Sequence, residues 1–341
     1  MDKAFPQECI GALREHPVFI GGIARSGTTL LQSLLDGHPQ LVVDPSESRF
    51  FLTFEPRSRH ASKEQKAELV EQIIFQPKGR FLDPEGDHYR NYFTHISYAS
   101  VREAFYRYLE QTSQQDSDYL SSAILAFGEV SGQLNEQSEY WVEKTIFNEW
   151  YAPLIFSWWK EAKFIHVLRD PRDVYATWKR RDANAARPLT SIDAFSYTWG
   201  KSAKLALNNQ RRFGRERYLV VYYERLVQEP EGQIARIAQF LDIIEHMALL
   251  TPSKAGGKHR WNGNSSSDRH FAGISPISVG QWRKSLAGEE VTLLEVLLGD
   301  DMEQHGYQLE TSSSTLLKIQ ALACRGKNLL RAIRDKFKTG K

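Results

Sequence analysis

The sequence predicts one α/β domain, a mainly parallel sheet flanked by helices on both faces. Short apolar runs alternate along the chain with stretches of helical periodicity, the order expected of strand–helix–strand units. A hydrophobic content of 41% in 341 residues supplies a sizeable core. The first apolar run ends in glycines and leads directly into a helical stripe, which is typical of the opening of such a unit. We therefore expect a single large domain.

Each predicted element is recognised by its periodicity and its end signals. The predicted strands are residues 17–22, 140–143, 164–168 and 218–223. The first predicted helix starts near residue 30 and ends at the stop signals Gly37 and Pro39. Two further helices begin at Asp170–Pro171 and at Pro230. The others cover residues 63–75, 101–110, 150–158, 289–304 and 315–337. Residues 251–285 lack periodicity and are expected to be loop. Residues 76–98 form a long excursion, and such loops are usually functional, for example as the cover of a pocket.

Composition excludes several classes of function. The formal charge of +2 gives no global attraction to nucleic acid, so anion binding has to come from local clusters. The two cysteines, Cys9 and Cys324, stand near opposite ends and show neither a disulfide framework nor metal-ligand spacing. Residues 1–17 do not resemble a secretory signal, and no run of about 18 apolar residues occurs. We expect a cytoplasmic protein.

The segment from Gly22 to Thr29, GIARSGTT, has the glycine spacing of a phosphate-binding loop between a strand and a helix. Such a loop directs successive backbone N–H groups at an anion near a helix N-terminus. Thr28 stands where a nucleotide kinase carries the lysine that reaches the outer phosphates. Arg25 adds a permanent cation suited to phosphate or sulfate oxygens. The alternative is an ordinary strand-to-helix turn, but the hydroxyls and Arg25 favour a P-loop-type anion site.

A second basic segment follows the third predicted strand. Arg169 ends that strand, and Asp173, Thr177 and Arg181 lie four residues apart and share one face of the following helix. Alone, this segment could equally be a surface arginine followed by a well-capped helix, with no anion site. Ligands of open parallel sheets, however, bind beyond the carboxyl ends of the strands. Two anion sites on one sheet edge therefore indicate a ligand that is phosphorylated at both ends.

These two segments, GGIARSGTTLLQSLLDGHP and VLRDPRDVYATWKRR, resemble the sulfotransferase superfamily that uses 3′-phosphoadenosine-5′-phosphosulfate (PAPS), in the branch of the tyrosylprotein and many bacterial sulfotransferases. The resemblance spans roughly residues 17–305. It implies that the 5′-phosphosulfate is held by Arg25, Ser26, Gly27, Thr28 and Thr29. It also implies that the 3′-phosphate is bound by Arg169 and Thr177, with Arg181 assisting, and that Tyr223 lies near the nucleotide.

The same resemblance implies catalytic roles. Glu47 falls where this branch carries its general base, with Asp44 as the reserve candidate because the spacing from His38 and Pro39 is slightly long. Lys144 matches the lysine that neutralises charge on the group in transfer, although Ile146 stands where the family usually has proline. No metal is expected. Residues 263–266 and 282–284 are candidate parts of a loop that closes over the nucleotide.

The predicted activity is sulfuryl transfer from PAPS to a hydroxyl or amine, on a small-molecule, lipid, glycan or peptide acceptor. A small-molecule P-loop kinase is the alternative, and a nucleotide-binding module without catalysis is the third possibility. We expect residues 1–310 to form the catalytic domain and residues 311–341 a basic amphipathic helix or tail. Such a helix is suited to weak contact with an anionic membrane surface, or else it packs on the domain, since Gly326 interrupts it.

Overall fold

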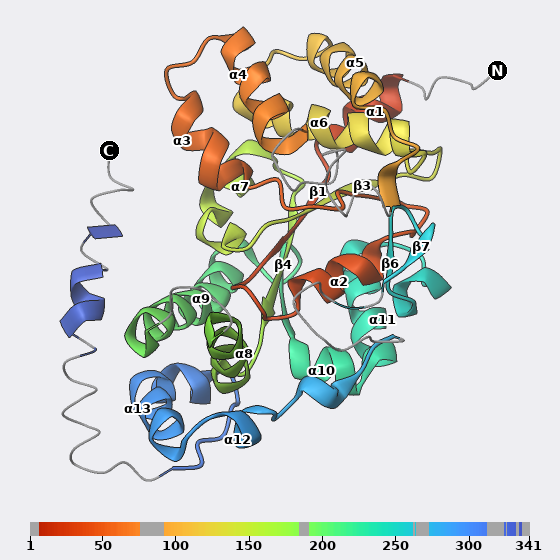
Figure 1. Ribbon diagram of the computed structural model, residues 1–341. Helices are drawn as coiled ribbons and strands as arrows, with labels where there is room; N and C mark the ends of the chain where they lie inside the picture. Colours follow the sequence, from red (N-terminus) through yellow and green to blue (C-terminus); the bar gives the residue numbers. More distant parts are fainter. Residues whose placement is uncertain are drawn as a thin grey trace.

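The computed structural model describes residues 7–75, 92–183, 191–261, 263, 273–311, 324, 326–331, 334 and 335. Its centre is a five-stranded sheet in the order β2-β3-β1-β4-β5, in which every neighbouring pair is parallel (Figure 1). The strands are β1 (Pro17–Gly21), β2 (Leu41–Val43), β3 (Tyr140–Lys144), β4 (Lys163–Leu168) and β5 (Tyr218–Tyr222). The α/β fold class is confirmed, and four of the five strands are the predicted ones.

Helices cover both faces of this sheet, because successive strand residues point to opposite sides. In β1, Val18 and Ile20 pack in one core with α2 (Thr28–Leu35) and α11 (Pro230–Leu241). Phe19 between them faces the other core, which it shares with α1 (Gln7–Arg14), α5 (Tyr98–Glu110) and α6 (Asp116–Ser131). All five residues of β1 are buried, which explains why the strand reads as a continuous apolar run.

The other elements extend the two layers. They are the π-helical turns η1 (Phe50–Phe54) and η2 (Glu71–Phe75), the 3-10 turns η4 (Asn148–Trp150), η5 (Met247–Leu250) and η6 (Pro276–Ser278), and the helices α3 (Glu55–Ser58), α4 (Lys63–Val70), α7 (Ala152–Trp158), α8 (Pro171–Ala183), α9 (Ile192–Phe213), α10 (Tyr223–Gln228), α12 (Trp282–Ser285) and α13 (Gly288–Gln304). Two-residue strands β6 (Ser253–Lys254) and β7 (His259–Arg260) pair antiparallel within the predicted 251–285 loop. Within the described ranges, no helix has the length and apolar character needed to cross a membrane.

The described part of the C-terminal segment lies against α9. Arg331 pairs with Asp193 at 2.7 Å, and Asp335 accepts a hydrogen bond from the Tyr197 hydroxyl at 2.7 Å. Leu329 and Leu330 are 64% and 68% exposed. The segment thus packs on the domain through its polar side chains and leaves two leucines in solvent. Most of the predicted 315–337 helix, and most of the predicted 76–98 excursion, lies outside the described residues.

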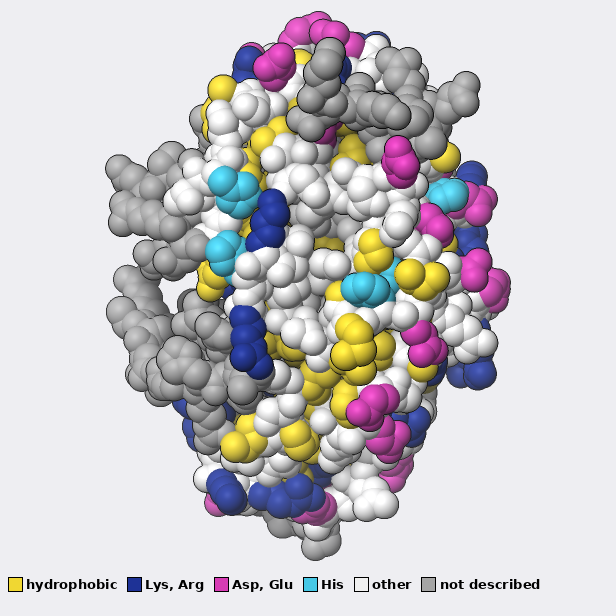
Figure 2. Space-filling model, turned by 90° about the vertical axis from the view of Figure 1, so that its right-hand side faces the viewer, with side chains coloured by type: hydrophobic (Ala, Val, Ile, Leu, Met, Phe, Trp, Pro, Cys, Tyr) yellow, Lys and Arg dark blue, Asp and Glu magenta, His cyan; other side chains and the backbone are white. Residues whose placement is uncertain are grey.

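Charges are mixed on the face of the molecule shown in Figure 2, which is the right-hand side of Figure 1. The Lys and Arg side chains coloured there are scattered among acidic and apolar ones. Proteins that follow a nucleic-acid backbone gather their Lys and Arg side chains into a patch or stripe. Among the described residues on this face, no such stripe is seen.

Candidate active site

The loop between β1 and α2 requires glycine at two places. Gly22 has φ +135°, and a Cβ there would lie 2.4 Å from the carbonyl oxygen of Val167 in β4. Gly27, at the N-cap of α2, has φ +100°, and a Cβ there would lie 2.4 Å from the Tyr223 ring. Both positions therefore exclude a side chain by conformation and by space. The loop is fixed between β4 and Tyr223, and the first-turn N–H groups of α2 point out of the helix end as an anion site requires.

The interior of this loop contains a polar atom that pairs with none of the described residues. The hydroxyl of Ser26 is buried and has no hydrogen-bond partner among the described residues. Thr28 is also buried, at the first position of α2. A buried polar group without a partner costs about 1–3 kcal/mol, so an oxygen-bearing ligand at the loop would relieve that cost. Arg25 takes a left-handed conformation, φ +74°, which turns the chain sharply between Ala24 and Ser26.

Arg169 joins the second basic segment to this loop. Its Nη1 donates to the carbonyl oxygen of Arg25 at 3.1 Å, and its Nη2 donates to the carbonyl oxygen of Ser278 at 2.6 Å. Its Nε is buried and lacks a partner within the described part of the chain. The guanidinium carbon stands 4.4 Å from the centre of the Tyr223 ring. Thus the ends of β1, β4 and β5 meet around one arginine, as the two-site prediction requires.

The helix after β4 supports the same region. Trp178 in α8 donates its indole N–H to the carbonyl oxygen of Ala24 at 2.9 Å, which ties this helix to the phosphate-type loop. The Thr177 hydroxyl donates to the Asp173 carbonyl oxygen at 2.9 Å and is half-buried. Asp170 accepts a hydrogen bond from the Arg172 N–H at 2.9 Å, so it caps the helix as predicted. Arg181 belongs to α8, but its side chain lies outside the described residues.

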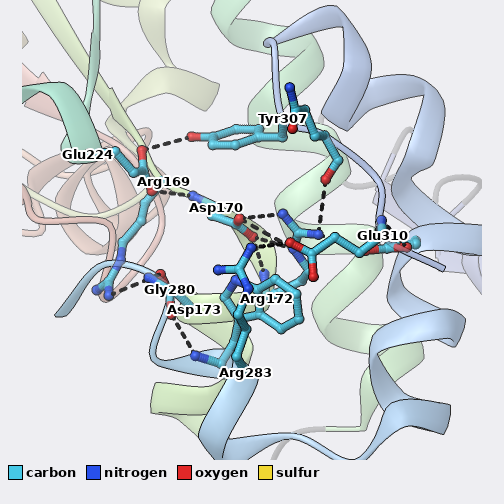
Figure 3. Close-up of polar contacts among 12 residues, drawn as sticks. Arg169, Asp170, Arg172, Asp173, Glu224, Gly280, Arg283, Tyr307 and Glu310 are labelled. Carbon is cyan, nitrogen blue, oxygen red and sulfur yellow. Dashed lines mark hydrogen bonds and ion pairs between the residues drawn. The ribbon is translucent and has the colours of Figure 1, made fainter.

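Figure 3 shows how Asp173 of α8 anchors the segment before α12, which contains Gly280. Its carboxylate accepts the N–H groups of Gly280 at 2.7 Å and Trp282 at 2.9 Å, and it lies 3.9 Å from the Arg169 guanidinium. Burial raises the pKa of Asp173. Arg283, in one of the two candidate loop segments, pairs with Glu310. Residues 276–283 are therefore held over Arg169 by a helical carboxylate, and of the other candidate segment, 263–266, only Gly263 is described.

The two predicted catalytic residues lie together at the end of a neighbouring strand. Lys144 ends β3, and it pairs in register with Ile20 of β1, one strand away from the glycine loop. Its Nζ lies 2.9 Å from Glu47 Oε1. The Lys144 side chain is 6% exposed and that of Glu47 is 26% exposed, so the carboxylate is the member of the pair that reaches solvent. Asp44, the reserve candidate, is buried, and its carboxylate accepts the Ser46 N–H at 3.2 Å.

A buried polar cluster of Glu149, Ser202, His166 and Tyr218 holds the start of the glycine loop. Glu149 is fully buried and accepts the Gly22 N–H at 2.8 Å and the Ser202 hydroxyl at 2.7 Å. His166 lies within 3.0 Å of that hydroxyl and 2.8 Å of the Tyr218 hydroxyl, and burial lowers the pKa of His166 to about 3. The imidazole of His166 and the carboxyl group of Glu149, whose pKa burial raises, thus lie together beside the start of the loop. The sequence shows only an acidic residue after an apolar strand, so this support could not be identified from it.

Glu224 gives a testable pH dependence of stability. It accepts the Asp170 N–H at 2.8 Å and the Tyr307 hydroxyl at 3.2 Å, and burial raises its pKa to about 6 (Figure 3). The folded chain binds the Glu224 proton more tightly than the unfolded chain does. The contribution of this group to the free energy of unfolding is therefore fully present below about pH 4.3, and it is lost as the pH rises through 6.

We therefore expect Glu224→Gln to gain stability relative to the native chain by roughly 2 kcal/mol between pH 4 and pH 7. Urea unfolding of both proteins across this range measures the difference. A difference that stays constant with pH would show that Glu224 titrates normally.

A family model described as the sulfotransferase family matches residues 17–246. This range contains every predicted site residue, from Arg25 to Tyr223. Protein-tyrosine sulfotransferase of Drosophila melanogaster is 24% identical over 285 residues, which are 82% of this chain and 49% of that protein. Protein-tyrosine sulfotransferase 2 of Gallus gallus is 25% identical over 81% of this chain and 66% of its own length. The chain thus spans about half to two thirds of these relatives.

A bacterial relative and two solved structures complete the comparison. The nodulation protein NoeE of Sinorhizobium fredii is 25% identical over 94% of this chain and 72% of its own length. The sulfotransferase domain of a Synechococcus olefin synthase superposes with a TM-score of 0.51 at 21% identity, covering 86% of this chain and 96% of that one. The sulfotransferase domain of the curacin biosynthetic pathway gives 0.52 at 19%, covering 86% and 99%. At such identities these two structures establish the similarity of fold.

Proposed function

The chain belongs to the sulfotransferase family, and from this premise we propose that it moves the sulfuryl group of PAPS to a hydroxyl or amine, with Glu47 as the general base. One observation carries the proposal. The glycine loop and Arg169, two anion-binding segments far apart in the sequence, are joined by the hydrogen bond from Arg169 Nη1 to the Arg25 carbonyl oxygen. The Glu47–Lys144 pair stands at the end of β3, the strand next to β1.

The residues at the loop fit the two ends of the donor. The N–H groups at the start of α2, together with Arg25, Ser26, Gly27, Thr28 and Thr29, are assigned to the 5′-phosphosulfate. Arg169, Thr177 and Arg181 are assigned to the 3′-phosphate. The Tyr223 ring, which packs on Gly27, is assigned to the part of the nucleotide between its two phosphorylated ends. Both buried polar atoms without a partner among the described residues of this region, Ser26 Oγ and Arg169 Nε, lie in these two groups. That neither atom is paired by a described residue supports an oxygen-rich ligand.

In the proposed reaction, the acceptor hydroxyl loses its proton to Glu47 as its oxygen forms a bond to sulfur, and the bond from sulfur to the donor phosphate oxygen breaks. As in phosphoryl transfer, the protein contributes positioning and charge stabilisation. Lys144 and Arg25 supply positive charge for the oxygens of the transferring group. The 2.9 Å contact between Lys144 and Glu47 supports this arrangement, because it puts proton removal and charge stabilisation at adjacent points.

The kinase alternative is not favoured. Thr28 occupies the position of the phosphate lysine, and the family match covers all the residues assigned to the donor and to catalysis. The acceptor is proposed from the names of the relatives, two of which are protein-tyrosine sulfotransferases, so a tyrosine hydroxyl in a peptide is the first acceptor to try. Small-molecule, glycan and lipid acceptors follow.

Incubation of the protein and labelled PAPS with a cell extract, followed by identification of the labelled product, tests the activity. Label transferred to a hydroxyl or amine is the expected result. PAPS binding without transfer to any acceptor would indicate a nucleotide-binding module without catalysis. ATP turnover that depends on Mg²⁺ would indicate a kinase.

The basic tail, residues 311–341, is a second candidate binding surface. We propose that it makes weak contact with an anionic membrane surface. The exposed Leu329 and Leu330 and the basic composition of residues 315–341 support it, whereas the ion pair of Arg331 with Asp193 favours packing on the domain. Equal flotation on anionic vesicles with and without residues 315–341 would exclude membrane contact. The cytoplasmic location and the boundary at residue 310 stay predictions.

A further inference from the structure

Glu143, the residue before Lys144 in β3, is fully buried and has no part in the mechanism described above. Four donors bind its carboxylate. Oε1 accepts the Ser48 hydroxyl at 2.7 Å, the Ser48 N–H at 3.2 Å and the Thr145 hydroxyl at 2.5 Å, while Oε2 accepts the Asn148 amide at 2.6 Å. Buried charge is tolerated only where such partners satisfy it. Two of the four bonds come from Ser48, the neighbour of the proposed base.

The Ser48 and Thr145 hydroxyls connect Glu143 to the next two residues of the loop that follows β2, Arg49 and Phe50. Ser48 Oγ accepts the Phe50 N–H at 3.2 Å, and Thr145 Oγ1 accepts the Arg49 N–H at 3.0 Å. Three successive N–H groups, of residues 48 to 50, are thus tied to Glu143 directly or through one hydroxyl. Arg49 has φ +52°, a left-handed conformation that a non-glycine residue keeps only where its surroundings impose it. The Glu143 cluster supplies those surroundings.

This cluster determines what Glu47 faces. Consecutive loop residues meet consecutive strand residues, since Ser48 contacts Glu143 and Glu47 contacts Lys144. The other side of the loop is held by Gln32 of α2, whose amide donates to the carbonyl oxygens of Asp44 at 2.5 Å and Ser46 at 3.3 Å. Glu47 therefore stands between two anchored ends of a short loop.

We propose that Glu143 is a positioning residue that holds Glu47 beside Lys144, an inference that rests on the proposed role of Glu47 as base. Both side-chain oxygens of Glu143 are required as acceptors, because the Ser48 and Thr145 hydroxyls already accept backbone N–H groups and so direct their protons at Glu143. Glutamine at this position would bring an NH₂ group into a site surrounded by donors. Glu143→Gln is therefore expected to loosen residues 48–50, while the glycine loop, whose Gly22 N–H is bound by Glu149, keeps its conformation.

The test uses labelled PAPS and a tyrosine-containing peptide as the probe acceptor. Glu143→Gln is expected to lower kcat at least tenfold, while the Kd of 3′-phosphoadenosine-5′-phosphate (PAP) changes less than twofold. Glu149→Gln is the matched control, since Glu149 is equally buried but binds Gly22 and Ser202 and does not touch the 44–50 loop. We expect this control to weaken PAP binding. The same loss of kcat at unchanged PAP affinity in both variants would indicate general damage and overturn the inference.

A double substitution separates positioning from an independent effect. If Glu143 acts through Glu47, the variant with both Glu47→Gln and Glu143→Gln is no slower than Glu47→Gln alone, because groups that act as a unit are not additive. Multiplied losses would contradict the inference.

Hydrogen exchange gives a readout that needs no turnover. The N–H groups of Arg49 and Phe50 are expected to exchange faster in Glu143→Gln but not in Glu149→Gln. A native chain that transfers no sulfate from PAPS to this peptide or to any acceptor in a cell extract would refute the proposed function, and unchanged exchange at these two positions would refute the role of Glu143.

Discussion

Glu47→Gln is expected to lower kcat for sulfuryl transfer by roughly 10²–10⁴-fold, the usual contribution of a general base. Glutamine keeps the shape of the side chain but cannot take up the acceptor proton, and it also ends the 2.9 Å ion pair with Lys144. The affinity for PAP should change little, since Glu47 is assigned to the acceptor and not to the donor. Steady-state rates with labelled PAPS and a tyrosine-containing peptide, together with calorimetry with PAP, measure both quantities.

Asp44→Asn is the matched control for this experiment. Asp44 lies three residues before Glu47 and was the reserve candidate for the base, but its carboxylate is buried against Ser46. Its substitution should leave most of the turnover intact. The reverse outcome, with Glu47→Gln active and Asp44→Asn inactive, would transfer the role of base to Asp44.

Lys144→Met is expected to produce the second large effect, a loss of roughly 10²–10³-fold in kcat, comparable to the removal of one preorganised charge or donor at a transition state. The buried methionine keeps the volume of the side chain, so the sheet should remain intact and thermal unfolding should show little change. Arginine at this position restores the charge but not the compact shape, and partial recovery is expected.

An exposed lysine gives the baseline for this loss. Lys179 on α8 pairs with Glu290 at the surface, and Lys179→Met should keep kcat within twofold of the native value. If Lys144→Met also kept its kcat, the positive charge at the end of β3 would have no part in the reaction.

The strands that carry the site could be predicted from the sequence because each is a short apolar run with a clear end. Residues 17–22 and 164–168 correspond to β1 and β4. Since parallel strands end on the same side of a sheet, the meeting of Arg25 and Arg169 could be anticipated without a structure. The strand order, with β1 between β3 and β4, could not, because it depends on the packing of helices that show no pairing signal.

The missed elements have local reasons. β2 is only three residues long, too short for a periodic signal. α6 buries residues on most of its circumference, from Tyr119 to Phe127, so it lacks the polar face that marks an amphipathic helix. Glu143 and Glu149 were overlooked because an acidic residue in a sequence is normally a solvent-exposed charge. Only the structure shows that both are buried and bind the segments that hold the site.

The glycine loop and the Arg169 segment are proposed to bind the two ends of one bisphosphorylated adenosine. Isothermal titration calorimetry with PAP, and in parallel with adenosine 5′-monophosphate, tests it most directly. The account predicts saturable heat with PAP and affinity for the monophosphate that is weaker by about tenfold or more, since the contacts of Arg169 with the 3′-phosphate are then lost. No heat with PAP, or equal affinity for the two nucleotides, would contradict it.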